Sequence, residues 1–596
     1  MKQMGKVLDQ TNREYLASLI PKDIPDWKAS WEEGYKIGQD IEIMETPFMK
    51  KYGVKSDAEY RLQQAAQGKL TYQINMGLAS VEDEAEGLRE AEKFNEETGL
   101  RISFAHQLPK NIVGTPKDKR EGVPTALGFD LNELSDWTTI TQASTIQAIF
   151  ADNHLGYPNA VETTINALKA GSMYQGMFGM FQQVAPGCPD EVWNMNENVK
   201  ALGIVASKWD DRVIVNSNQD DSLPAYCMDL ASYLAWAKWE RYVVTDLCKA
   251  RYAFSFGNLT SNLIHKAAMW LAASDTFRRD DQPGIEFIYP NTVDHWDHHL
   301  HSNYGFQIPE ALMLNLVERK YKTGGSFLSV PISEKVAIPT VPEMLDMTGA
   351  CQRTDEAAPY FEQMMDWTVV EETRDRIKEY SEIMFQNFMN GMEEAGIDIT
   401  NPIEMMVVLK KMDPTKFEQL FHPSIVQDGK DRVEPMLPAA LWSVSENMSL
   451  GIIDQLKDTD YPKKLKGKRV CIVSGDLHYF GLYVMSRVLE ELGADVLYGG
   501  NSMDAIDVLD LADEHGIKNV AISLHNGQAL PYARLLKQLA EERGREYNFY
   551  LGGALTSFLN EDDEVPVDVT EYIEEMGLHT TASVEELAIA LAEQED

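Results

Sequence analysis

This sequence of 596 residues has few cysteines, few basic residues and no long apolar run. Its five cysteines are odd in number and lack Cys-x-x-Cys spacing, which excludes a disulfide framework and a zinc ribbon. No segment approaches the roughly 18 apolar residues of a membrane span, and the polar first residues include no apolar signal core. We therefore expect a cytoplasmic protein that is neither secreted nor membrane-spanning.

The shortage of basic residues also limits the possible partners. The chain has 54 Lys and Arg against 94 Asp and Glu, a formal net charge of -40. Such a charge repels nucleic acids and anionic membrane surfaces, so we expect neither as a partner. The length exceeds what one hydrophobic core supports and predicts three or four structural units.

Short apolar strands alternate with helical stretches between residues 70 and 340. Leu70–Asn75, Arg212–Asn216 and Ile285–Tyr289 have strand patterns, and Ala160–Ala170 and Ser261–Ala273 have helical periodicity. This alternation predicts a catalytic (β/α)8 TIM-type barrel. We expect a helical N-terminal arm over residues 1–69 and a further helical segment over 341–455.

The last part of the chain repeats a strand-helix unit. A polar stretch with proline and glycine predicts a linker over residues 456–467, and a doubly wound, flavodoxin-like α/β domain over 468–596. The expected strands and helices follow in chain order: strand Lys468–Ser474, helix Leu482–Leu492, strand Asp495–Tyr498, helix Met503–Glu514, strand Asn519–Leu524, helix Pro531–Arg543 and strand Tyr547–Leu551.

Three loops of this domain fall on one edge of its predicted sheet. The first strand runs into Asp476–Gly481 (DLHYFG), which places a histidine two residues after an aspartate. Ser523–Gly527 follows a later strand, and the pair Gly552–Gly553 follows the last one. Ligands bind at the carboxyl ends of parallel strands, and a metal-bound imidazole needs an acceptor for its second nitrogen. A receiver or nucleotide-binding domain is the main competing interpretation, and it gives no reason for the histidine.

These loops resemble the cobalamin-binding domain of the base-off, histidine-on enzymes, whose signature is Asp-x-His-x-x-Gly, then Ser-x-Leu, then Gly-Gly. Ile522 stands at the usual serine position, and Ser523 stands one residue later. The resemblance implies that His478 is the lower cobalt ligand and that Asp476 holds its other ring nitrogen. The implied cofactor-binding residues are Asp476, Leu477, His478, Tyr479, Phe480, Gly481, Ser523, Leu524, Gly552 and Gly553.

A barrel followed by such a domain resembles the adenosylcobalamin-dependent mutases, in which the cofactor lies between the barrel mouth and the histidine-bearing edge. Several barrel segments are similar to the large subunit of glutamate mutase: Gln73–Gly77, His154–Pro158, Asn216–Gln219 and Phe256–Asn262. Of that family's three substrate-binding arginines, only Arg120 has a match, since Asn75 occupies another position. Gln219 stands where the family has its catalytic glutamate.

The fused arrangement looks more like 2-methyleneglutarate mutase, which forms 3-methylitaconate and needs no ammonium-binding glutamate. Its dicarboxylate substrate requires cationic or amide partners, for which Arg120, Gln175 and Gln219 are candidates. The resemblance thus implies an isomerase that uses adenosylcobalamin on a small carboxylic acid. We expect a homo-oligomer.

Two other functions remain open. Another glutamate-mutase-like or acyl-coenzyme A mutase shares the cofactor, although the Thr-Ile-Arg-Gln-Tyr-type segment of the latter is missing. A corrinoid methyltransferase or methyl carrier uses the same signature, usually behind a four-helix cap that the helical segment could mimic.

A histidine cluster follows the strand that ends at Tyr289. Four of the twelve histidines lie at His295, His298, His299 and His301. On a helix, the first three would share a face with metal-ligand spacing. A zinc-like site, a polar active-site wall and plain surface all remain possible, and we include His295 among the candidate catalytic residues.

Overall fold

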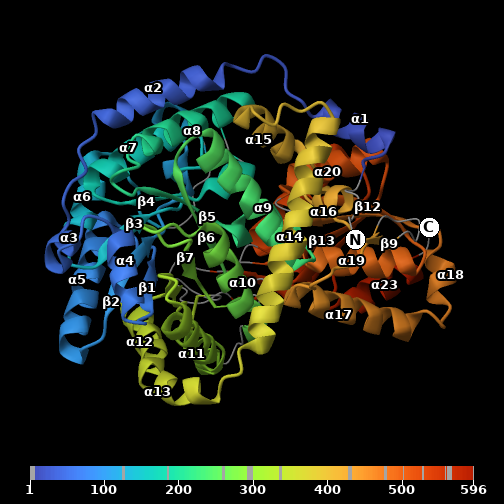
Figure 1. Ribbon diagram of the computed structural model, residues 1–596. Helices are drawn as coiled ribbons and strands as arrows, with labels where there is room; N and C mark the ends of the chain where they lie inside the picture. Colours follow the sequence, from blue (N-terminus) through green and yellow to red (C-terminus); the bar gives the residue numbers. More distant parts are fainter. Residues whose placement is uncertain are drawn as a thin grey trace. The chain divides into compact units, whose positions relative to one another are not determined.

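The computed structural model describes residues 7–594 except 122, 124–127, 184, 186, 258–261, 291–299, 335–338, 427–431, 476–479, 501–502, 526–528, 558 and 560–566. The chain divides into two compact units. One contains Met1–Ile332 and Ile338–Ala439, and the other contains Ser333–Ala337 and Ala440–Asp596. The second unit is orange and red in Figure 1.

The first unit contains a sheet of eight parallel strands in the described part of the chain, in the order β3-β2-β1-β8-β7-β6-β5-β4. β3 and β4, at the two ends of this order, also lie against each other, which nearly closes the sheet into a barrel. The predicted barrel is therefore confirmed. The strands are β1 (Thr71–Met76), β2 (Ile102–Gln107), β3 (Gln147–Phe150), β4 (Tyr174–Gln175), β5 (Ile214–Asn218), β6 (Arg251–Phe256), β7 (Ile285–Ile288) and β8 (Ser326–Leu328).

A helix follows each barrel strand and packs outside the sheet (Figure 1). Apolar residues on the outer faces of β1, β2 and β3 form a buried core with these helices, as Ile74, Ala105 and Phe150 illustrate. The helices are α5 (Val81–Thr98), α6 (Leu134–Thr141), α7 (Ala160–Ala170), α8 (Glu191–Ala206), α9 (Leu230–Arg241), α10 (Leu263–Phe277), α11 (Tyr304–Tyr321) and α12 (Val341–Gln352).

Further helices surround the barrel within the same unit. The N-terminal residues form α1 (Gln10–Ser18), α2 (Trp27–Gln39), α3 (Pro47–Tyr52) and α4 (Asp57–Ala66). After the barrel come α13 (Thr354–Phe361), α14 (Thr368–Glu394), α15 (Pro402–Lys411), α16 (Lys416–Phe421) and the strand pair β9 (Ile425–Val426) and β10 (Arg432–Val433). The long helix α14, yellow in Figure 1, packs on α9 and α10.

The second unit is built on a parallel sheet in the order β12-β11-β13-β14-β17. Its strands are β11 (Arg469–Ser474), β12 (Asp495–Gly500), β13 (Asn519–Leu524), β14 (Asn548–Gly553) and β17 (His579–Thr580). The observed β11 to β14 agree with the predicted strands to within a residue or two. This is the order of flavodoxin-like doubly wound sheets.

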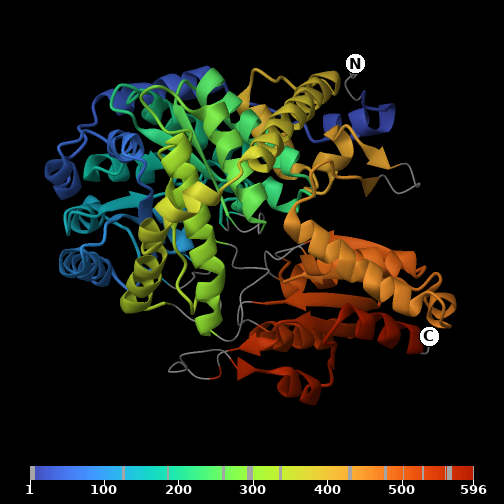
Figure 2. The ribbon, with the colours of Figure 1, turned by 60° about the horizontal axis from the view of Figure 1, so that its bottom comes forward.

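Helices cover both faces of this sheet, as the orange and red ribbons of Figure 2 show. Val473 and Ile522 belong to the core on one face, and Ile472 and Ala521 to the core on the other. Successive residues alternate because a strand turns them to opposite faces. The helices are α17 (Ala440–Leu456), α18 (Tyr461–Leu465), α19 (Phe480–Glu491), α20 (Ala505–His515), α21 (Ala529–Arg543), α22 (Thr570–Glu575) and α23 (Val584–Glu593). α18 lies within the stretch predicted as a linker.

A short antiparallel pair, β15 (Thr556–Ser557) and β16 (Val567–Asp568), completes the second unit. Throughout the described residues, no helix has the length and apolar character needed to cross a bilayer. All five cysteines are buried and free.

Candidate functional site

The strands that lead into the predicted loops end at the same carboxyl edge of the C-terminal sheet. β11 lies between β12 and β13 in the sheet. The connection after β11 leads to β12 on one side, and the connection after β12 leads back to β13 on the other side of β11. This reversal is the position where open α/β sheets bind ligands. After β11 and Gly475 come Asp476, Leu477, His478 and Tyr479, which lie outside the described residues, whereas Phe480 begins α19.

Strand register aligns the other predicted cofactor residues. Ser523 of β13 pairs with Ser474 of β11 and with Gly552 of β14. Leu524 pairs with Gly553 in the next row. The Ser523 carbonyl accepts hydrogen bonds from Gly475 N at 3.0 Å and Ser474 Oγ at 3.3 Å. Residues of the second and third motifs, with Ser474 of β11, thus form two neighbouring rows across adjacent strands.

The glycines of this edge are places where the chain approaches itself closely. A methyl group on Gly481 would lie 2.8 Å from Ser523 Oγ, and one on Gly552 would lie 3.0 Å from the Thr581 carbonyl oxygen. Gly553 has φ +96°, and a side chain there would lie 2.4 Å from the Leu524 carbonyl oxygen. Larger residues at these positions would force neighbouring atoms to move, most of all at Gly553, where the obstructing atom belongs to the backbone.

Ser523 contributes a hydroxyl at this edge, one residue after the position expected from the family pattern. Ile522 is 1% exposed and packs in the apolar core with α20 and α21. Ser523 points to the opposite face, where Gly481 of α19 lies against it. Moving the serine from position 522 to position 523 therefore places its hydroxyl on the other face of the sheet, since adjacent strand residues point in opposite directions.

The predicted barrel residues do not form one cluster. Arg120, after the short helix η2 (Lys117–Lys119), donates from Nε to the Thr115 carbonyl oxygen at 2.8 Å and from Nη1 to Asn132 Oδ1 at 2.9 Å. Gln175 ends β4 and donates from Nε2 to the Ser172 carbonyl oxygen at 2.9 Å. Among the described residues, no hydrogen bond links the side chains of Arg120, Gln175 and Gln219. His295 lies outside the described residues.

Gln219 belongs to a buried network between the barrel wall and α9. Its Nε2 donates to Glu240 Oε2 at 2.8 Å, and Tyr252 Oη donates to the same oxygen at 2.7 Å. Ser217 Oγ and Trp236 Nε1 donate to Glu240 Oε1, each at 2.9 Å. Burial raises the pKa of Glu240, and these donors oppose the rise. The arrangement satisfies a carboxyl group with no exposed surface.

The barrel interior contains a polar cluster that the sequence did not predict. His106 of β2 lies with Nε2 3.3 Å from Oδ2 of Asp152, which follows β3. Asp221 ends the short helix η4 (Gln219–Asp221) after β5 and accepts a hydrogen bond from Asn218 Nδ2 at 2.5 Å. Glu286 belongs to β7 and is fully buried. These residues come from four parts of the barrel wall, of which only β2 and β3 pair with each other.

A β-bulge places Glu286 inside. Phe254 pairs with Ile285, whereas Phe256 pairs with Ile288, so two residues of β7 face one residue of β6. Both Glu286 and Phe287 consequently face the interior, where the Phe287 ring lies 5.4 Å from the His106 ring.

Arg61 reaches into the same interior from α4. Its Nη1 donates to the Glu286 carbonyl oxygen at 2.7 Å, and its Nη2 lies 3.7 Å from Glu286 Oε1. The guanidinium lies 4.1 Å from the centre of the Phe104 ring and 4.9 Å from that of Tyr174. A fully buried cation therefore lies beside Glu286.

Burial and mutual repulsion change the acidity of this cluster. Burial, with the charge of Asp152 next in importance, raises the pKa of Asp221 to about 7. Burial also raises the pKa of Glu286 to about 7, against the attraction of Arg61 and His106. Burial would lower the pKa of His106, but Asp152, Glu286 and Asp221 outweigh it and raise that pKa. The cluster therefore exchanges protons near neutral pH, as catalytic sites often do.

Several buried polar atoms of the interior have no hydrogen-bond partner among the described residues. They include His106 Nδ1, Tyr174 Oη, Gln175 Oε1 and Asn218 Oδ1. A buried polar atom without a partner costs about 1–3 kcal/mol. Such a group of atoms is typical of an interior that receives a polar ligand or water. Asn218, two residues after the predicted strand Arg212–Asn216, was a signal available in the sequence, whereas no strand was predicted at His106.

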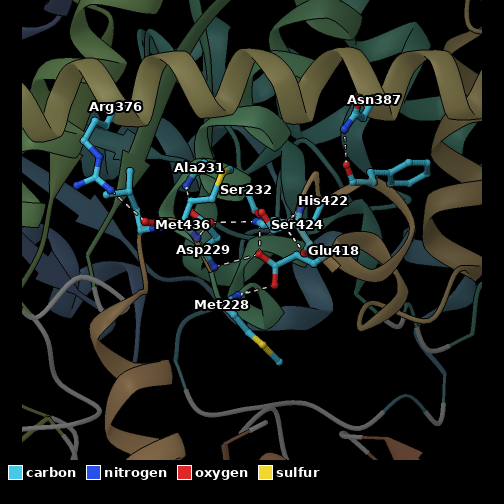
Figure 3. A network of polar contacts seen from close by, with 12 residues as sticks. Met228, Asp229, Ala231, Ser232, Arg376, Asn387, Glu418, His422, Ser424 and Met436 are labelled. Carbon is cyan, nitrogen blue, oxygen red and sulfur yellow. Dashed lines mark hydrogen bonds and ion pairs between the residues drawn. The ribbon is translucent and has the colours of Figure 1, made fainter. Parts of the chain in front are cut away.

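A second buried network, drawn in Figure 3, lies between α9 and α16. Asp229 caps α9 and accepts from His422 Nε2 at 3.0 Å. Glu418 accepts from Ser232 Oγ at 2.5 Å and from the Asp229 and Met228 amides at 3.0 and 2.7 Å. Burial would lower the pKa of His422, but the hydrogen bond with Asp229 and the nearby carboxylates raise it. Its bonds are satisfied internally, so we interpret this network as structural.

Within the described residues, no group of three or more His, Cys, Asp and Glu side chains has a metal-binding arrangement. The histidines at 295, 298 and 299 lie outside the described residues, and their role stays a prediction.

Comparison with known proteins relates only part of the chain to a characterised protein. No protein-family model matches it. Over 84 residues, 14% of its length, it is 27% identical to the glutamate mutase sigma subunit 2 of Haloarcula marismortui, and this match spans 57% of that subunit. The chain thus covers little more than half of this relative. Among solved structures, a cobalamin-binding protein from Desulfitobacterium hafniense matches at 16% identity with a TM-score of 0.18, over 25% of this chain and 78% of that one.

Proposed function

We propose that this chain binds a corrinoid at the carboxyl edge of its C-terminal sheet and uses it to rearrange the carbon skeleton of a small carboxylic acid. The observation that carries the proposal is the row formed by Ser474, Ser523 and Gly552, because the Asp476–Gly481 motif begins two residues after Ser474 in the sequence. The mutase assignment draws on the sequence match to a subunit of glutamate mutase.

The described residues of the edge fit a large flat cofactor. Gly481, Gly552 and Gly553 let neighbouring segments of the chain approach closely at this edge, and Ser523 adds a hydroxyl in the row of Gly552. His478 would be the cobalt ligand, and Asp476 would accept a hydrogen bond from its second ring nitrogen. Ser523, Leu524, Gly552 and Gly553 would line the part of the site on β13 and β14.

Adenosylcobalamin, when bound, supplies a weak cobalt–carbon bond whose homolysis starts radical rearrangements. The barrel supplies a polar interior lined with His106, Asp152, Asp221 and Glu286, closed below by Arg61. Radical chemistry needs such an enclosure because it excludes water and alternative hydrogen donors. The first substrate to test is 2-methyleneglutarate, with 3-methylitaconate as the product.

The test uses purified protein whose histidine residues are labelled with nitrogen-15. This protein is reconstituted with adenosylcobalamin. Electron paramagnetic resonance of the reduced cofactor should show coupling of one histidine nitrogen to cobalt. The coupling should disappear in His478→Ala and persist in His579→Ala, a matched change of an exposed histidine in the same domain. Absence of bound corrinoid, or ligation by the cofactor's own base, would contradict the proposal. A corrinoid that accepts methyl groups without rearranging any acid would favour a methyltransferase.

A further inference from the structure

We infer that His106 binds a carboxylate of the substrate in the barrel interior, through its Nδ1 atom. The inference rests on the proposed function only in taking the substrate to be a carboxylic acid. His106 would be a cationic partner for the substrate that the sequence comparison did not reveal. In that comparison, only Arg120 matched a substrate-binding arginine of the glutamate mutase family.

The His106 ring is held in one orientation. Its Nε2 lies 3.3 Å from Asp152 Oδ2, and the ring meets Phe287 edge to face, with a centroid distance of 5.4 Å and an angle of 81°. The side chain is nearly buried, with the residue 2% exposed. The other ring nitrogen, Nδ1, has no hydrogen-bond partner among the described residues. The ring is thus fixed by one nitrogen and has the other available to a ligand.

The surrounding charges favour the cationic form of this histidine, and Asp152 contributes most to that effect. Three carboxyl groups face it from separate elements: Asp152 after β3, Asp221 in η4 and Glu286 in β7. Arg61 approaches the same interior from α4 and lies beside Glu286. The net effect raises the pKa of His106. A protonated imidazole has two N–H donors, so Nδ1 would donate a charge-assisted hydrogen bond to an anion.

The neighbouring acids do not exclude an anionic ligand. The pKa values of Asp221 and Glu286 are raised to about 7, so each is protonated in part of the molecules at neutral pH, and Asp152 is the main group that raises the pKa of His106. A neutral carboxyl group can donate a hydrogen bond to a carboxylate instead of repelling it. Asp152 remains the partner of Nε2. The alternative is that the acids themselves bind a cationic ligand.

Calorimetric titration of the full-length protein with glutarate and with 1,5-diaminopentane separates these possibilities. The two probes have matched length and opposite charge. We expect glutarate to bind and the diamine not to bind. His106→Gln should weaken glutarate binding at least tenfold. Binding of the diamine alone, or unchanged glutarate affinity in a folded His106→Gln protein, would overturn the inference.

The pH dependence of glutarate affinity provides a second test, because a purely structural role of His106 would leave that dependence unchanged. Glutarate affinity should be highest when His106 is protonated and should fall as the pH rises through the pKa of His106. Asp152→Asn removes the nearest negative charge, so the fall should begin at lower pH while the Nδ1 donor remains. This variant also serves if His106→Gln does not fold. An unshifted profile in Asp152→Asn would contradict the inference.

Corrinoid uptake by the same variants, followed by absorbance, distinguishes this inference from the proposed function. Both variants should take up corrinoid like the wild type, because they leave the C-terminal motif unchanged. If the wild type binds no corrinoid but glutarate binding depends on His106, the proposed function fails and the carboxylate site stands.

Discussion

Gly481 at the start of α19 lies so close to Ser523 on β13 that a methyl group at position 481 would be 2.8 Å from Ser523 Oγ and 3.5 Å from Ser523 Cβ. The first distance is a clash and the second is an ordinary contact. The final glycine of the Asp476–Gly481 motif and the serine of the next loop are therefore sterically linked, although 42 positions separate them in the sequence.

Gly481→Ala should destabilise the protein by about 1–3 kcal/mol, because the added methyl group overpacks this contact. The double variant Gly481→Ala with Ser523→Ala should recover most of that loss, since the atom responsible for the clash is gone. Urea denaturation of the four proteins in this cycle measures the coupling. Gly451→Ala in α17 is the control, because nothing lies within 4 Å of its new methyl group. Additive effects in the cycle would contradict the contact.

Gln219→Glu should destabilise the protein by more than about 2 kcal/mol, because it removes a donor and places a second carboxyl group beside buried Glu240. The matched control is Gln386→Glu on α14, where an exposed glutamine donates to Glu382 at 3.0 Å. There, solvent screens the new pair and little change is expected. Urea denaturation at pH 7.5 compares the two variants, and equal effects would rule out a buried network.

Stability should fall as the pH rises from about 5 to 8. The pKa values of Asp57, Asp221, Glu286 and Glu418 are raised to about 7, mainly by burial. Between the unfolded and folded pKa values, the folded protein binds more protons than the unfolded chain, so the free energy of unfolding decreases with pH.

Thermal unfolding across this pH range measures the slope. Glu286→Gln should reduce the slope, because it removes one group that binds a proton in the folded state. Glu379→Gln at an exposed position of α14 is the control. Stability that increases with pH over this range would contradict the expected protonation.

Asp229→Asn should cost about 3–5 kcal/mol, since it leaves His422 and the surrounding buried groups without their charged partner. The raised pKa of His422 means that the ion pair stabilises the protein below the unfolded pKa of histidine and is lost as the pH rises through the folded value. The cost should therefore be larger at pH 6 than at pH 9.

The control for this variant is Asp275→Asn, which removes an ion pair with Lys378 at 3.0 Å whose side chains are both 40% exposed. It should cost at most about 1 kcal/mol. Urea denaturation at both pH values tests the pair of variants. A cost of Asp229→Asn that does not change with pH would argue against a charged His422.

Strand periodicity in the sequence predicted the barrel and the C-terminal sheet, because buried parallel strands are short apolar runs. It also predicted that Ser523 and Gly552 would share an edge, which follows from parallel pairing. It did not predict the His106 cluster, since His106 and Asp221 are far apart in the sequence and only closure of the barrel brings them together. The bulge that turns Glu286 inward leaves no periodic signal. The short helix α18 was also missed, because its composition is that of a polar linker. A homo-oligomeric state and a cytoplasmic location stay predictions.

Closure of the barrel requires β1 to pair with β8, with Thr71 opposite Ser326, 255 residues later in the chain. During synthesis, one edge of β1 must therefore wait for that partner to leave the ribosome. At about 5–20 residues per second, the delay is roughly 10–50 s. An open strand edge invites pairing with other chains. The early barrel strands of this protein are consequently the region most in need of chaperone protection while the chain is still being made.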